Sequence, residues 1–79
     1  MDKKSIEIIG WYGVVALIIA YGLISFSLLK SSDFVYQFLN LTGAIGIIVD
    51  TFSKRDYQPT AVNIVWAIIA FIALLKIIF

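Results

Sequence analysis

Three long runs of uncharged, mostly apolar residues, separated by two short charged turns, constrain this chain more than any other feature of its sequence. The first run, residues 8–29, contains 22 residues. As a helix it would span about 33 Å, at about 1.5 Å per residue, and the hydrocarbon core of a bilayer is about 30 Å thick. We therefore expect this run to cross a membrane as a helix, and the two later runs to do the same.

The charged turns set the bounds of the predicted helices. Lysine, serine and aspartate fill residues 30–33, and a second turn at residues 54–59 ends in Pro59. Proline commonly separates one helix from the next. We predict helices over about residues 7–29, 34–53 and 60–79, forming a single domain over residues 1–79.

Composition supports an all-α membrane protein with the lipid bilayer as its partner. The sequence is 62% hydrophobic and 14% charged, whereas soluble domains are about 45–50% apolar and about 25% charged. A soluble chain of this length would have too little interior to bury so much apolar surface. The net charge of +1 provides no basic stripe, and no nucleic-acid partner is expected.

Basic residues near the helix ends predict an orientation, because loops rich in lysine and arginine stay on the cytoplasmic side. The two groups are Lys3, Lys4, Lys54 and Arg55 on one side, against Lys30 and Lys76 on the other. This bias predicts a cytoplasmic N-terminus and a C-terminus outside. Trp11, Tyr12, Tyr36 and Tyr57 fall near helix ends, where aromatic residues anchor a protein at the membrane interface.

Each predicted helix has one face of small or polar residues and one face of bulky apolar residues. In lipid, helices associate through small residues that permit close backbone approach. The residues expected at such contacts are Gly13, Ala16, Ala20, Gly43, Ala44, Gly46, Ala67, Ala70 and Ala73. These faces are wider than one neighbour can cover, so the working unit is expected to be a homo-oligomer, by default a dimer, or part of a larger membrane complex.

Four polar or aromatic residues on these inner faces are candidates for lining a pathway or contacting a substrate: Asn40, Asp50, Asn63 and Trp66. An ionisable residue at membrane depth is a functional candidate by default. Asp50 and Asn63 are predicted at similar depth, so a hydrogen bond between them is one expectation. The alternative is that Asp50 is solvated or paired with Lys54 at i+4.

The other inner polar residues also have two interpretations. Asn40, at the depth of Tyr21 and Ala73, either bonds a neighbouring helix or lines a polar cavity. Trp66 beside Asn63 either forms a wall of a small-molecule site or packs in the core. Gln37 and Lys76 are expected to meet at the outer rim as a structural contact.

Enzymatic chemistry has little support. The chain has no histidine and no cysteine, and only one carboxylate is predicted at membrane depth. No acid–base pair, nucleophile–base pair or metal cluster can be assembled from these residues. The glycine pairs lie inside apolar helices and not after a strand, so they are not phosphate loops. We expect no enzyme, catalytic residue, metal or cofactor.

Four segments resemble a family of small three-helix bacterial inner-membrane proteins of unknown function. They are YGLISF at 21–26, YQFLNLTGAIG at 36–46, KRDYQP at 54–59 and NIVW at 63–66. The resemblance covers most of the chain. It implies a multi-pass protein of the inner membrane and supplies no activity.

The layout is also similar, more distantly, to the SemiSWEET half-transporters and their PQ-loop relatives. Shared features are three helices, a glycine-bearing second helix, a short loop ending in proline, and an asparagine early in the third helix. The similarity implies a dimer around a central sugar site, with Asn63 contacting substrate. The Pro-Gln hinge of the first helix is replaced by Ile24-Ser25-Phe26, and the second helix lacks the substrate-facing tryptophan. The similarity therefore favours the architecture more than sugar transport.

Two functions remain open at this point. The first is a homo-oligomer with a transporter-like bundle for a small solute. The second is a ligand-free accessory or scaffolding subunit of a larger membrane complex.

Overall fold

The computed structural model describes residues 1–79 and contains three α-helices joined by two short turns. The helices are α1 (Lys3–Ser25), α2 (Phe34–Ser53) and α3 (Tyr57–Ile78). Each of them is long and apolar enough to cross a membrane. The predicted all-helical class with three membrane-length helices is confirmed.

Two of the predicted helices have different bounds in the structure. α1 begins at Lys3 instead of residue 7, because Asp2 caps its N-terminus by accepting a hydrogen bond from the Ser5 amide at 2.8 Å. It ends at Ser25 instead of residue 29, and Ser27 follows in the left-handed region with φ 60°. α3 begins at Tyr57, before Pro59. A proline in the first turn of a helix is tolerated because the N–H that it lacks has no intrahelical partner there.

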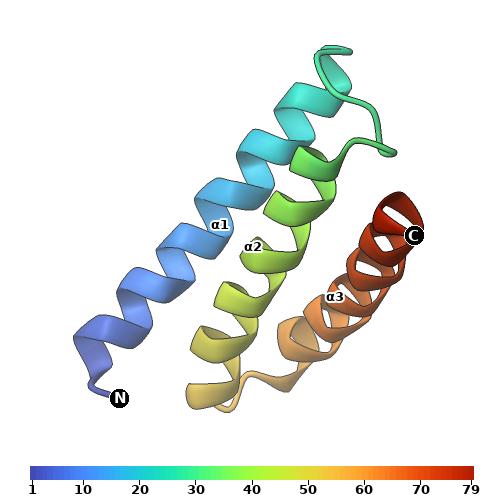
Figure 1. The fold of residues 1–79 in the computed structure, drawn as a ribbon. Coiled ribbons are helices and arrows are strands. Elements are labelled where there is room, and N and C mark those ends of the chain that lie inside the picture. The colour runs from blue at the N-terminus through green and yellow to red at the C-terminus, as the bar shows by residue number, and fades with distance from the viewer.

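The three helices form an open row with α2 in the middle (Figure 1). α1 and α3 each pack along α2 and do not contact one another. This arrangement is more open than the predicted bundle. Gly43 and Gly46 of α2 meet α1. Ala44 is fully buried and lies seven residues before Thr51, which meets α3, so it shares the α3-facing side of α2.

Glycines bring the backbones of α1 and α2 into direct contact. A Cβ atom added to Gly13 would lie 2.5 Å from the Gly43 carbonyl oxygen, and one added to Gly46 would lie 2.7 Å from the Ile9 carbonyl oxygen. The hydroxyls of Tyr12 and Thr42 also meet across this interface, 2.8 Å apart. Such close approach is possible only where at least one of the two residues has no side chain.

Small residues and hydroxyls join α2 to α3. Ala70 is fully buried, and the hydroxyls of Thr51 and Thr60 lie 2.6 Å apart. Of the nine small residues expected at helix contacts, Ala67 and Ala73 are half-buried and the other seven are buried. Large apolar side chains cover the exposed surface of the helices, as expected for surfaces that face lipid.

Candidate functional site

The open row leaves a hollow over α2, between α1 and α3. A cavity of about 410 Å³ lies there and draws two residues from each helix. We call it the amide cavity, and its lining residues are Leu17, Tyr21, Tyr36, Asn40, Trp66 and Ile69. It is the one place where all three helices contribute to a single concave surface.

The amide cavity offers uncharged hydrogen-bonding groups among aromatic and aliphatic walls. Asn40 is half-buried, and none of the side-chain hydrogen bonds within the chain involves its amide. Both the N–H donors and the oxygen acceptor of this amide are therefore free for a ligand. Tyr21 and Tyr36 add hydroxyls, and the half-exposed Trp66 ring adds a flat apolar face.

Asn63 does not share this cavity with Trp66. Its side chain is buried and donates a hydrogen bond to the Pro59 carbonyl, one turn earlier, at 2.9 Å. The expected wall built from Asn63 and Trp66 is therefore not formed, and only Trp66 lines the cavity. The amide of Asn63 instead satisfies a carbonyl in the first turn of α3.

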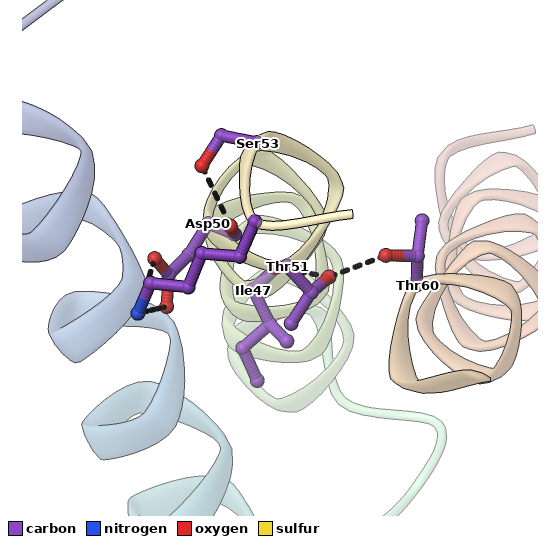
Figure 2. A network of polar contacts seen from close by, with 6 residues as sticks. Ile47, Asp50, Thr51, Ser53 and Thr60 are labelled. Atoms are coloured by element: carbon purple, nitrogen blue, oxygen red, sulfur yellow. Dashed lines mark hydrogen bonds and ion pairs between the residues drawn. The ribbon is translucent and has the colours of Figure 1, made fainter. Parts of the chain in front are cut away.

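Asp50 points away from α3, so the expected hydrogen bond to Asn63 is absent. Figure 2 shows Asp50 directed toward α1, while the neighbouring Thr51 points to Thr60 on α3. Successive helical residues differ by about 100° around the axis. A single helix therefore cannot aim both Asp50 and Thr51 at α3, and the threonine occupies that side.

Lys54 forms the i+4 ion pair with Asp50, its Nζ lying 3.1 Å from Oδ1. The same ammonium is 3.5 Å from Oδ2, which is a long hydrogen bond, and Oδ1 receives no hydrogen bond of good geometry. The contact is therefore an ion pair in which Oδ1 is buried and accepts no hydrogen bond. Opposite it, the backbone of Gly10 gives the carboxylate room: a Cβ there would lie 2.6 Å from Oδ2.

A second cavity, of about 370 Å³, surrounds this carboxylate. We call it the charged cavity, and its lining residues are Glu7, Gly10, Trp11, Val14, Asp50 and Lys54. It lies at the end of the row where α1 begins and α2 ends. Asn40 and Trp66 thus lie together in one cavity, and Asp50 lies in another.

The expected contact between Gln37 and Lys76 is also absent. The Gln37 amide donates a hydrogen bond to the Ser31 carbonyl at 2.7 Å, and its Oε1 is buried without a partner. Gln37 therefore connects the turn between α1 and α2 to α2 itself, and Lys76 remains exposed.

Sequence reasoning missed Tyr21 and Tyr36 as cavity residues. Tyr36 fits an interfacial anchor equally well, because it lies near a helix end. The available signal was its spacing of four residues from Asn40, and the same spacing of Tyr21 from Leu17, since residues four apart share a helix face. No group of three or more histidine, cysteine, aspartate or glutamate residues could hold a metal ion.

A short chain of three helices, each long and apolar enough to cross a membrane, has the architecture of a small multi-pass membrane protein. Residues 6–79 match the model of an uncharacterised protein family, and the chain belongs to that family. No curated protein and no solved structure matches the chain. The similarity to the SemiSWEET proteins therefore stays a prediction.

Proposed function

We propose that this protein works in a bacterial inner membrane as a homo-oligomer, by default a dimer, with a transporter-like bundle that binds a small solute. The observation that carries the proposal is the amide cavity, which unites Asn40 and Trp66 with residues of all three helices. No carboxylate, histidine or cysteine lines the cavity, and we propose binding without a reaction.

The lining suggests a neutral polar solute. Ligand cavities of about 300–1,000 Å³ typically combine apolar walls with a few polar groups that fix orientation, and the amide cavity has about 410 Å³. No charged residue lines it. An amide and two phenols bind hydroxyl or carbonyl groups well and would not compensate a buried charge.

The open side of the cavity supports an oligomer. α1 and α3 do not meet, so a single chain cannot enclose a solute within the bilayer. A second copy placed over the same face by two-fold symmetry would cover the hollow and set a second Asn40 and Trp66 opposite the first pair. The SemiSWEET-like layout implies the same arrangement, in which two three-helix units surround one central site.

One observation favours the second candidate function, an accessory subunit without a ligand. Gly22 on α1 has no atom within 4 Å of the position of an added Cβ. A small residue with open space beside it is what a membrane partner's helix requires for close packing. In this alternative a helix of a different protein packs against Gly22.

The test is native mass spectrometry of the full chain released gently from membranes, as wild type and as Asn40→Leu and Trp66→Leu. We expect the wild type to be a homodimer that carries a small molecule. Both variants should lose the bound molecule. Matched controls are Gln58→Leu, an exposed amide outside the cavity, and Phe71→Leu, an exposed aromatic residue of α3. A dimer without any bound molecule would contradict solute binding. Recovery only with an unrelated protein in fixed ratio would replace the proposal by the accessory subunit.

A further inference from the structure

The charged cavity and the amide cavity lie along the same face of the α1–α2 pair. On α1 their linings follow one another as Gly10, Val14, Leu17 and Tyr21, at alternating spacings of four and three residues. Residues at these spacings share one helix face. The charged cavity therefore opens onto an apolar strip that leads along α1 toward the amide cavity.

The second helix continues the same strip. Asp50 of the charged cavity and Asn40 of the amide cavity are linked by Ile47 and Gly43, again at spacings of three and four residues. Gly13 packs on both Ile47 and Gly43, and Gly43 packs on Leu17, so the two strips run side by side. From Glu7 to Tyr21 the strip extends about 21 Å, at about 1.5 Å per residue.

The charged cavity presents both signs of charge beside an indole ring. Lys54 forms its ion pair with Asp50, while Glu7 has no ion-pair partner. Trp11 lies four residues after Glu7, on the same helix face, and its ring is largely exposed. A carboxylate beside an exposed indole is suited to an ammonium group, through charge and cation–π attraction. Lys54, and Lys3 in the adjoining surface hollow, are suited to a phosphate.

We infer that the charged cavity binds the headgroup of a zwitterionic aminophospholipid, whose acyl chain lies along the strip of Val14 and Leu17. Glu7 and Trp11 receive the ammonium, and Lys54 receives the phosphate. The inference goes beyond the solute site, because it concerns a different cavity and a different class of ligand.

The charged cavity and the apolar strip follow one another in the same order as the headgroup and acyl chains of a lipid in a bilayer. The charges lie at the helix ends, where headgroups lie, and the apolar strip runs inward from them, where acyl chains lie. An anionic lipid without an ammonium group would leave Glu7 facing a phosphate of the same sign. Selectivity for the aminophospholipid is therefore the specific consequence of this site.

The test reconstitutes the full-length protein in vesicles of equal phosphatidylethanolamine and phosphatidylglycerol. The protein is then extracted gently, and retained lipids are identified by native mass spectrometry. We expect one phosphatidylethanolamine per chain. Glu7→Gln should lower its retention about tenfold, as for the loss of one charge-assisted hydrogen bond. The matched control is Asp56→Asn, which neutralises an exposed carboxylate at the same end of the molecule but outside the cavity. It should leave retention unchanged.

A second pair of variants tests the acyl strip. Val14→Trp fills the strip and should abolish retention, whereas Val15→Trp, on an exposed position outside both cavities, should not. Equal retention of phosphatidylglycerol, no effect of Glu7→Gln, or equal loss in the two tryptophan variants would overturn the inference. Free phosphoethanolamine, added in excess, should not displace the lipid. Its binding in place of phospholipid would reassign the cavity to a soluble ligand.

Discussion

At the scale of single residues, three glycines of α1 have three different surroundings. Gly10 makes room for the carboxylate of Asp50, and Gly13 makes room for the backbone of α2 at Gly43. Gly22 has open space beside it. In lipid, the absence of a side chain stabilises a helix pair only where another helix takes up the space. The three positions should therefore respond differently to the same substitution.

Gly13→Ala should destabilise the α1–α2 pair, and Gly22→Ala should not. The new methyl at position 13 would meet backbone atoms of Gly43 and Ile47 at 2.5 and 2.8 Å, which cannot rotate away. Overpacking of this kind typically costs about 1–3 kcal/mol. At position 22 the helix should gain roughly 0.5–1 kcal/mol, because alanine restricts the unfolded chain. Unfolding by SDS in mixed micelles, followed by circular dichroism, measures both. Equal loss in the two variants would contradict the contact.

Asp2 should make the start of α1 sensitive to acid. Its hydrogen bond with Ser5 lowers the pKa of the Asp2 carboxyl below its ordinary value of 3.8. A lowered pKa means that the ionised carboxylate stabilises the folded cap. This stabilisation is complete above the ordinary value and is lost as the pH falls through the folded pKa.

The amide chemical shift of Ser5, followed by NMR in micelles, reports the Asp2 cap directly. It should titrate with a midpoint below pH 3.8. In Asp2→Ala this titration should disappear, while the amides of α3 remain unchanged. A midpoint at or above the ordinary value would show that the carboxylate does not cap the helix.

At the scale of helices, the two interfaces of α2 differ in kind. The interface with α1 rests on backbone contact between glycines, whereas the interface with α3 combines buried alanines with a pair of threonines. Thr51 and Thr60 each also approach a carbonyl of their own helix, Ile47 and Asp56 respectively. The two hydroxyl protons are divided among these three contacts, so the interhelical hydrogen bond competes with the two bonds to carbonyls.

A double-mutant cycle on Thr51→Val and Thr60→Val should give a small favourable coupling. Interhelical hydrogen bonds in membranes contribute about 0.6 kcal/mol on average, and the shared protons keep the value near that average. A matched cycle on Thr42→Val and Thr60→Val should be additive, because Thr42 bonds Tyr12 on the opposite side of α2. The free energy of unfolding in micelles supplies all the values. Coupling in both cycles, or in neither, would rule out a direct bond.

Helix number and the burial of the small residues can be predicted from the sequence, because both follow from local patterns. Run length defines three helices, and the period of 3.6 residues separates Ala16 and Ala20 from the bulky residues between them. The neighbour that each face meets depends on how the helices are arranged, which no local pattern specifies. Of the two expectations for Asp50, the structure therefore has the i+4 ion pair with Lys54 and not the hydrogen bond to Asn63. The polar arc of α2 is shared between two neighbours, and Asp50 belongs to the α1 side.

At the scale of the whole molecule, the open row allows one cavity to be lined by all three helices, and the charged cavity lies between α1 and the end of α2. A closed bundle would have removed the hollow over α2 by bringing α1 against α3. The amide cavity thus arises from the missing contact between the outer helices. The row also fixes which ends of the helices share a membrane surface. The N-terminus and the α2–α3 turn lie at one end, and the α1–α2 turn and the C-terminus lie at the other.

Orientation in the membrane should follow the four basic residues at the first end, with the N-terminus in the cytoplasm. The chain has no cysteine, so a single introduced cysteine is the only site in the chain that a maleimide labels. Ser32→Cys, in the α1–α2 turn, should react with an impermeant maleimide added outside intact cells. Gln58→Cys, beside the α2–α3 turn, should react only after the membrane is opened. The reverse pattern would invert the topology.

The cause of the orientation can be tested in the same cells. Lys3→Gln together with Lys4→Gln leaves two basic side chains at each end. If charge determines the topology, both reporters should then become partly accessible from outside. An unchanged pattern in this variant would mean that another feature of the chain, and not its charge bias, directs insertion.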